Sequence, residues 1–303
     1  MRILTPAIIL LVFAASCSSP AQDQAIRDIS SASMIVLSSE QSASSSPIED
    51  RTKGLRIAAV GNGSAEILVA MGLTKSVVGR DIASEIVELQ DVPVVTNGHD
   101  LVAERVLSLK PDILITDPDT SPKNVVRQVK RAGVQVVEMP ESYDLDGISR
   151  KVSAIALAIG VPDIGDRLNA SISSAIKEPA PPRGSKARVL FLYLRGSNGI
   201  FLVGGKGSGA DLLLRAAGAL DLGSTLYENP FTPINSEAIL GLNPDRYLLM
   251  SAGLESVGGL DAFRRLPGID PKVPVITVDD SLLLAFGPRT PDLIRQLREA
   301  IYD

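Results

Sequence analysis

The sequence predicts an α/β fold in which two Rossmann-like lobes are joined by a single long helix. Three observations lead to this prediction. Short apolar runs alternate with helical patterns along the chain, which is typical of parallel sheets covered by helices on both faces. One segment occurs twice, once in each half, and a helical pattern over residues 146–178 lies between the halves. The 303 residues, 45% of them apolar, are enough to bury the cores of two lobes.

Residues 1–17 have the features of an export signal. Met1 and Arg2 give a short basic start, and residues 7–15 form an apolar run that is too short for the roughly 20 residues a membrane span needs. Small residues then lead to Cys17, the only cysteine. This segment resembles a bacterial lipobox, in which the cysteine is lipidated, although Ala14 stands where that motif usually has Leu. An ordinary signal with a chance cysteine is the alternative.

Residues 18–54 are rich in Ser, Ala and Gln. Such a composition buries too little apolar surface to offset the entropy of ordering, so we expect a flexible tether. A tether behind a lipidated Cys17 predicts a protein that is extracytoplasmic and anchored to the cell membrane.

The first lobe is expected over residues 55–145. An apolar strand pattern at 56–60 ends in a Gly-Asn-Gly turn, and Ser64 then starts a helix that Gly72 closes. Further strands are expected at 77–79, 92–95, 112–116 and 134–139, with helices at 103–109 and 125–132.

Residues 146–178 have apolar positions at helical spacing, interrupted at Gly160 and Pro162. We interpret them as one long connecting helix, with an ordinary two-part surface helix as the alternative. A second lobe follows over 187–303, with strands expected at 188–194, 247–250 and 274–278 and a helix at 211–217. The two lobes share the pattern E-x-[VI]-L-x-L-x-P-D, which runs from Glu104 to Asp112 and from Glu237 to Asp245. This repeat indicates homologous lobes.

Composition excludes several functions. A net charge of −5 argues against nucleic-acid binding. One Cys and one His cannot form an internal disulfide or a Cys/His zinc site, and a Ser-His-Asp triad is possible only through that His. The glycine-rich run 204–209 lacks the spacing of a phosphate-binding loop. Without a nucleophile–base pair or a pair of carboxylates in a recognisable frame, we do not expect an enzyme.

Six stretches of residues 55–303 match a known family. These are GRD at 79–81, NGHDL at 97–101, YLRG at 193–196, GSGAD at 207–211, GLESVGG at 253–259 and FGPRT at 286–290. The chain resembles the haem-binding lipoproteins of bacterial haem ABC importers, within the helical-backbone (class III) periplasmic solute-binding proteins. The resemblance implies haem (iron protoporphyrin IX) as the transported ligand, an ABC permease with its ATPase as partner, and a monomer.

The resemblance assigns the axial ligands of the haem iron to His99 and Tyr193. His99 follows an expected strand, and loops at strand ends line the ligand crevice of open α/β sheets. Tyr193 ends the first strand of the second lobe, and Arg195, two residues on, lies on the same side of that strand. A guanidinium beside a phenol favours the phenolate that binds ferric iron. A loop histidine and a packed strand-end tyrosine are the alternatives; Tyr143 and Tyr227 are weaker candidates.

Further roles are expected for other residues. Arg80 and Arg289 are candidates to pair with the haem propionates. Four apolar residues are expected to cover the porphyrin faces: Phe201, Leu254, Val257 and Phe286. In the resembling class an acidic residue on each lobe meets arginines of the permease, and we assign this docking role to Glu66 and Asp211, each near a helix start. Plain surface arginines and helix-start acids are the alternatives.

Two other functions stay open. A ferric-siderophore or corrinoid receptor would have the same fold, although siderophore pockets commonly use more aromatic residues than the 4% present here. A two-domain α/β enzyme related to metal chelatases would make His99 catalytic.

Overall fold

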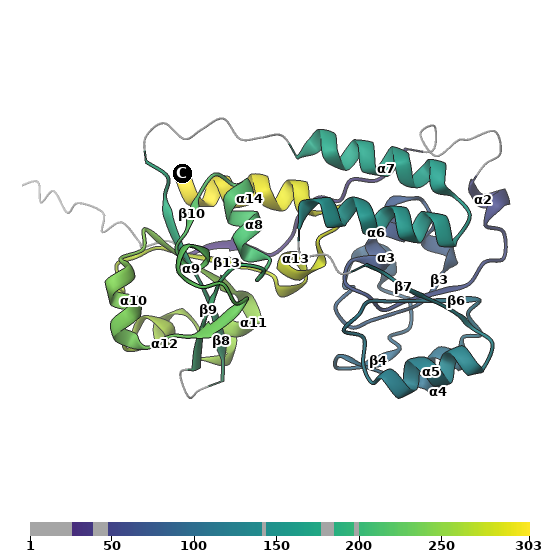
Figure 1. Cartoon of the computed structure of the whole chain (residues 1–303), viewed down its shortest axis with the longest axis horizontal. Coiled ribbons are helices and arrows are strands. Elements are labelled where there is room, and N and C mark those ends of the chain that lie inside the picture. Colours follow the sequence, from purple (N-terminus) through teal and green to yellow (C-terminus); the bar gives the residue numbers. More distant parts are fainter. Residues whose placement is uncertain (1–25, 39–47, 141–143, 177–184, 197–199) are drawn as a thin grey trace, which may run out of the picture.

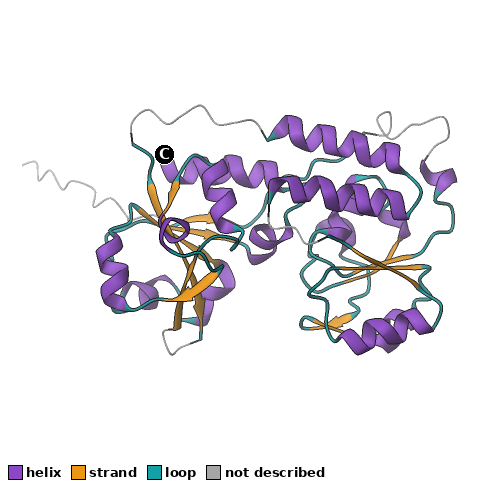
Figure 2. Ribbon diagram, in the orientation of Figure 1, coloured by secondary structure: helices purple, strands orange, loops and turns teal. Residues whose placement is uncertain are grey.

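The computed structural model describes residues 26–38, 48–140, 144–176, 185–196 and 200–303. Within these ranges the chain forms two lobes side by side, with a pair of helices along one side of the N-terminal lobe (Figure 1). Each lobe has a sheet flanked by helices (Figure 2). The predicted α/β architecture of two lobes is confirmed.

The N-terminal lobe contains a parallel sheet with the strand order β3-β2-β6-β7. The central strands β2 and β6 are buried throughout, as expected for parallel strands covered on both faces. The strands are β2 (Ile57–Ala59), β3 (Val77–Arg80), β6 (Ile113–Thr116) and β7 (Gln135–Glu138). The helices are α3 (Ser64–Ala70), α4 (Ala103–Ser108) and α5 (Lys123–Arg131), and the short 3-10 turns are η1 (Thr74–Ser76) and η2 (Val87–Leu89).

The C-terminal lobe has a mixed sheet with the order β1-β13-β12-β8-β9-β11, and β10 also pairs with β8. Its strands are β1 (Arg27–Ile29), β8 (Arg188–Arg195), β9 (Ile200–Gly204), β10 (Leu220–Asp221), β11 (Phe231–Pro233), β12 (Arg246–Met250) and β13 (Val275–Val278). Its helices are α8 (Ala210–Ala216), α9 (Leu222–Leu226), α10 (Ser236–Leu242), α11 (Ser251–Ser256), α12 (Leu260–Arg264), α13 (Asp280–Ala285) and α14 (Thr290–Tyr302). The expected all-parallel sheet is wrong here, because β9 runs antiparallel to β8 and β11 antiparallel to β9.

The connection between the lobes is two helices, α6 (Leu145–Ala158) and α7 (Pro162–Ala175), which pack against each other (Figure 1). The single long helix expected over 146–178 is therefore wrong, and the two-part alternative is correct. Gly160 has a φ of 77°, and Pro162 begins α7. A left-handed residue followed by proline ends one helix and starts the next in a new direction.

Residues 26–38 do not form the flexible tether expected there. β1 (Arg27–Ile29) pairs in parallel with β13, and the amide of Leu37 donates to the carbonyl of Ala70 at the end of α3. This segment, which we call the strap, therefore crosses from one lobe to the other (Figure 1). Ile29 and Leu37 are both buried. A few aliphatic residues and an open sheet edge thus outweigh a Ser-rich composition.

α2 (Ile48–Arg51) also lies within the expected tether, and Ile48 is buried. The export signal and Cys17 lie outside the described residues. Among the helices that the structure describes, none combines the length and the apolar character needed to cross a membrane.

Candidate functional site

A cleft of about 640 Å³ lies between the lobes. Both sheets present the carboxyl ends of strands to it. In one lobe the segments after β2 and β3 line the cleft, and in the other the end of β8 and the segments after β12 and β13 do so. Ligands of open α/β sheets bind at this end of the strands. The described residues lining the cleft include Asn62, Gly63, Glu66, Asp81, Ser84, His99, Tyr193, Leu194, Arg195, Leu202, Phe231, Met250, Ser256, Asp280, Ser281, Leu283 and Leu284.

His99 lies at the tip of a hairpin and not in the strand-to-helix loop expected from the sequence. β4 (Thr96–Asn97) and β5 (Asp100–Leu101) are antiparallel, and Gly98, with a φ of 56°, begins the two-residue turn between them. Such turns use glycine because it adopts positive φ without strain. The side chain of His99 is exposed and lines the cleft from the N-terminal lobe.

Tyr193 lines the same cleft from the C-terminal lobe, near the end of β8. Its half-buried ring lies 5.3 Å from the ring of Phe231 between centroids, in a tilted arrangement. The guanidinium carbon of Arg195 lies 5.6 Å from the centre of the Tyr193 ring. Contacts with an aromatic ring and a guanidinium restrict the orientation of the phenol. The structure thus brings Tyr193 and Arg195 together and places His99 on the opposite wall.

Arg80 does not serve as a propionate partner in this structure. Its guanidinium donates to the carbonyls of Leu89 (3.1 Å) and Asp81 (3.1 Å), and the residue is 9% exposed. It therefore holds the loop after β3 together. In the sequence, an arginine near a strand end looks the same whether it faces a ligand or its own backbone.

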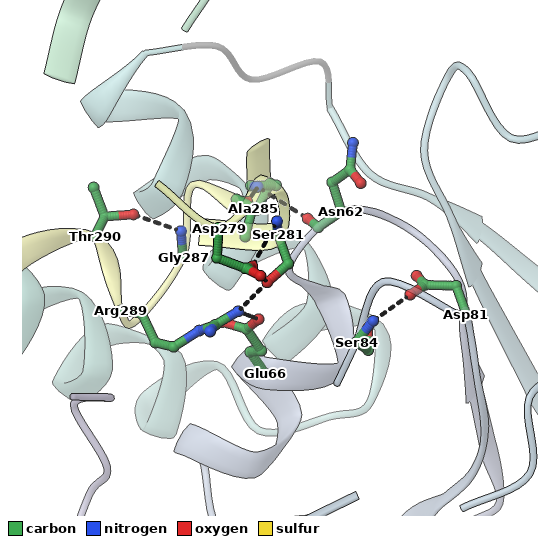
Figure 3. Close-up of polar contacts among 11 residues, drawn as sticks. Asn62, Glu66, Asp81, Ser84, Asp279, Ser281, Ala285, Gly287, Arg289 and Thr290 are labelled. Atoms are coloured by element: carbon green, nitrogen blue, oxygen red, sulfur yellow. Dashed lines mark hydrogen bonds and ion pairs between the residues drawn. The ribbon is translucent and has the colours of Figure 1, made fainter. Parts of the chain in front are cut away.

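The guanidinium of Arg289 also forms its hydrogen bonds within the protein. Its guanidinium forms a two-bond pair with the carboxylate of Glu66, one bond of 2.9 Å from Nε to Oε2 and a second from the terminal nitrogen to Oε1 (Figure 3). The same nitrogen lies 3.3 Å from the hydroxyl of Ser281. The predicted propionate partner is thus part of a buried contact between the lobes.

This pair also overturns the docking role predicted for Glu66. The residue is 2% exposed, so an external partner cannot reach its carboxylate. Asp211 accepts hydrogen bonds of 3.1 Å from the amides of Gly207 and Gly209, and its side chain closes the turn before α8. Both helix-start acids therefore act inside the protein, and Asp211 alone is partly accessible.

The apolar wall of the cleft differs from the one expected. Leu254 and Phe286 are buried in the hydrophobic cores, and Val257 packs partly buried against one of them; the side chain of Phe201 lies outside the described residues. Leu202, Phe231, Met250, Leu283 and Leu284 line the cleft instead. The alternation of side chains along β9 could have identified Leu202 as a cleft residue from the sequence. Phe231 could not be identified in this way, because its sequence looks like a loop and its strand is formed by pairing with β9, which is distant in the sequence.

Two carboxyl groups in the cleft have pKa values above their usual range. Burial raises the pKa of Asp81 above its usual range, against the opposing effect of its hydrogen bonds from Ser84. Burial likewise raises the pKa of Asp280, and the amide of Ala252 opposes this. Desolvation disfavours the charged form of each acid. Within the described residues, no cluster of three or more His, Cys, Asp or Glu side chains is arranged to hold a metal ion.

Two α/β lobes whose strand ends face one shared cleft define a ligand-binding protein. Residues 57–269 match the family described as "Periplasmic binding protein", and the chain belongs to that family.

Solved structures with the same fold include heme-binding proteins. The periplasmic heme-binding protein RhuT from Roseiflexus sp. RS-1, in its apo form, is 31% identical with a TM-score of 0.75; the match covers 82% of this chain and 98% of that chain. The heme-binding protein HmuT is 31% identical with a TM-score of 0.71, covering 82% and 84% of the two chains. The vitamin B12-binding protein of Vibrio campbellii (strain ATCC BAA-1116) is 22% identical over 152 residues, 50% of this chain and 55% of that protein.

Proposed function

We propose that this protein captures haem in the cleft between its lobes and delivers it to an ABC permease. The observation that carries the proposal is the placement of His99 and Tyr193 on opposite walls of one cleft. Imidazole and phenolate are both axial ligands of haem iron in proteins. A porphyrin supplies the four equatorial donors itself, so a site with one protein donor on each side suits it. Binding and delivery, with no catalysis, are the activities proposed.

Arg195 is the propionate partner that this structure favours. Arg80 and Arg289 are engaged within the protein, whereas the exposed guanidinium of Arg195 lines the cleft. A guanidinium matches the geometry of a carboxylate and forms two parallel hydrogen bonds with it. Arg195 is thus assigned two roles, orienting Tyr193 and attracting one propionate.

A corrinoid is the second candidate ligand, because the matching protein of Vibrio campbellii is a vitamin B12-binding protein. Titration with hemin separates the two. We expect a sharpened Soret band that saturates, and no saturable change with cyanocobalamin under the same conditions. If hemin causes no spectral change and cyanocobalamin binds saturably, the ligand is a corrinoid and not haem.

The membrane anchor is part of the same proposal and rests on Cys17. We expect Cys17→Ala to release the protein into the soluble fraction while its hemin titration stays unchanged, because the expected lipid is attached outside both lobes. Fractionation of cells after a high-salt wash measures this. A variant that stays in the membrane fraction would contradict lipid anchoring through this cysteine.

We propose that the permease meets Glu104 and Glu237 in place of Glu66 and Asp211. Both lie in the first turn of a helix, at the same position of the repeated motif, and both are exposed. Their helices, α4 and α10, lie on the side of the molecule away from α7 (Figure 1). One exposed carboxylate at the same place on each lobe fits a transporter with two related docking sites.

The double variant Glu104→Lys with Glu237→Lys is expected to bind hemin normally and to lose haem-dependent stimulation of the transporter ATPase. Charge reversal at an exposed rim acts mainly on association with a partner. The matched control is Asp146→Lys with Asp166→Lys, which reverses two exposed charges on α6 and α7. If both double variants stimulate the transporter ATPase equally, the two glutamates are not part of the docking surface.

A further inference from the structure

Lys151 lies where the two lobes meet. It belongs to α6, is 3% exposed, and donates to two carbonyls that are far apart in the sequence. One is the carbonyl of Asn62 in the loop after β2, at 3.0 Å, and the other is that of Ala285 at the end of α13, at 2.6 Å. Asn62 and Ala285 lie next to each other (Figure 3). One ammonium group thus joins the N-terminal lobe, the connecting helix and the C-terminal lobe.

Burying the ammonium group of Lys151 in this contact costs desolvation free energy, so the hydrogen bonds that it forms there need an explanation. Desolvation lowers the pKa of Lys151 to about 8, and the charges of Glu66 and Asp117 oppose that shift. The other buried side chains on this face of α6 are aliphatic, such as Ile148, Val152 and Ile155. An apolar residue there would pack without a desolvation cost. The ammonium supplies what apolar packing lacks, short and directional hydrogen bonds to two fixed points.

The backbones of the two lobes also approach closely at this point. A Cβ atom on Gly63 would lie 2.7 Å from the carbonyl oxygen of Ala285 and 3.6 Å from Nζ of Lys151. The φ of Gly63 is 76°, a conformation that favours glycine. The Glu66–Arg289 pair and the strap cross the same junction. At Gly63 there is therefore no space for a side chain between the two backbones.

We infer that Lys151 is a positioning residue that fixes the angle between the lobes, and with it the separation of His99 and Tyr193, before any ligand binds. The effect on axial ligation by His99 and Tyr193 rests on the proposed function. The role of Lys151 in fixing the angle between the lobes does not rest on it.

The test measures the distance between the lobes directly. Spin labels on Lys130→Cys in α5 and Leu240→Cys in α10, both exposed positions, report it in a Cys17→Ala background that is otherwise free of cysteine. The starting protein is expected to give one narrow distance distribution that hemin leaves unshifted. Lys151→Met is expected to broaden that distribution without ligand, and hemin should narrow it again. The control is Arg150→Met, which removes an exposed cation from the same helix and should change nothing.

A second variant covers the case in which Lys151→Met does not fold. Gly63→Ala inserts a methyl group between the lobes without altering the lysine, and should broaden the same distribution. In both variants we expect hemin affinity to fall about 10-fold, the lower end of losses seen when groups supporting the metal ligands are removed, together with a change in the axial-ligand spectrum. Distributions like that of the starting protein in both variants would overturn the inference. Altered distances with no hemin binding by any form would keep the positioning role of Lys151 and reject haem as the ligand.

Discussion

Tyr193→Phe is expected to weaken hemin binding by at least about 100-fold and to change the charge-transfer and Soret bands. The substitution removes one oxygen and keeps the ring that packs 5.3 Å from Phe231, so the cleft retains its shape. Loss of a direct iron ligand should exceed the roughly 10- to 100-fold losses typical of supporting groups. Arg195→Ala, which removes such a group, should therefore have the smaller effect.

His99→Ala should alter the spectrum in a different way, because it removes the donor from the opposite wall. The double variant is expected to bind hemin more weakly than either single variant. Tyr227→Phe is the matched control, since Tyr227 is half-buried against the core of the C-terminal lobe and does not line the cleft. Absorption titrations at fixed pH measure the starting protein and each of these variants. If both single variants keep the starting spectrum and affinity, these residues do not bind the iron.

Glu66→Ala is expected to lower the free energy of unfolding by about 3 kcal/mol or more. The substitution leaves the guanidinium of Arg289, whose side chain is 11% exposed, without its carboxylate. Breaking a buried pair by removing one partner typically costs about 3–5 kcal/mol, whereas replacing both partners by apolar groups is often nearly neutral. The double variant Glu66→Leu with Arg289→Met should therefore recover most of the loss.

Guanidinium denaturation, with the slope and midpoint compared between variants, measures these differences. Glu299→Ala is the control, because it breaks the pair with Arg295 in which both side chains are more than half exposed. Such exposed pairs contribute about 0–1 kcal/mol. A loss in Glu66→Ala no larger than that of the control would mean that the pair between the lobes adds little to stability.

Much of the fold follows from local patterns in the sequence. The apolar runs at β2, β6, β8, β12 and β13 all form strands, and the repeated motif begins at equivalent helices, α4 and α10. These features depend on neighbouring residues, and hydrophobic periodicity reports them directly. The break at Gly160 and Pro162 was visible as well, but the periodicity on either side of it does not show whether the chain continues straight or turns back.

Site residues were predictable from the sequence where their position along a strand decides whether they line the cleft. Tyr193 and Arg195 are two residues apart at a strand end, and both line the cleft. The partners of charged groups were not predictable in this way. Glu66 and Arg289 are 223 residues apart, and no local pattern distinguishes a carboxylate that meets a buried guanidinium from one that faces solvent.

The sequence by itself determined the α/β class, the two related lobes, and a Tyr placed near the end of a strand. Those features arise from residue types and spacings over a few turns of chain. Only the tertiary structure decided that Arg27–Ile29 complete a sheet edge, that Arg80 and Arg289 bond within the protein, and that Lys151 joins the lobes. Each of these depends on which groups meet after folding. The desolvation of a charge and the pairing of a backbone are set by partners that are distant in the chain, so local sequence cannot specify them.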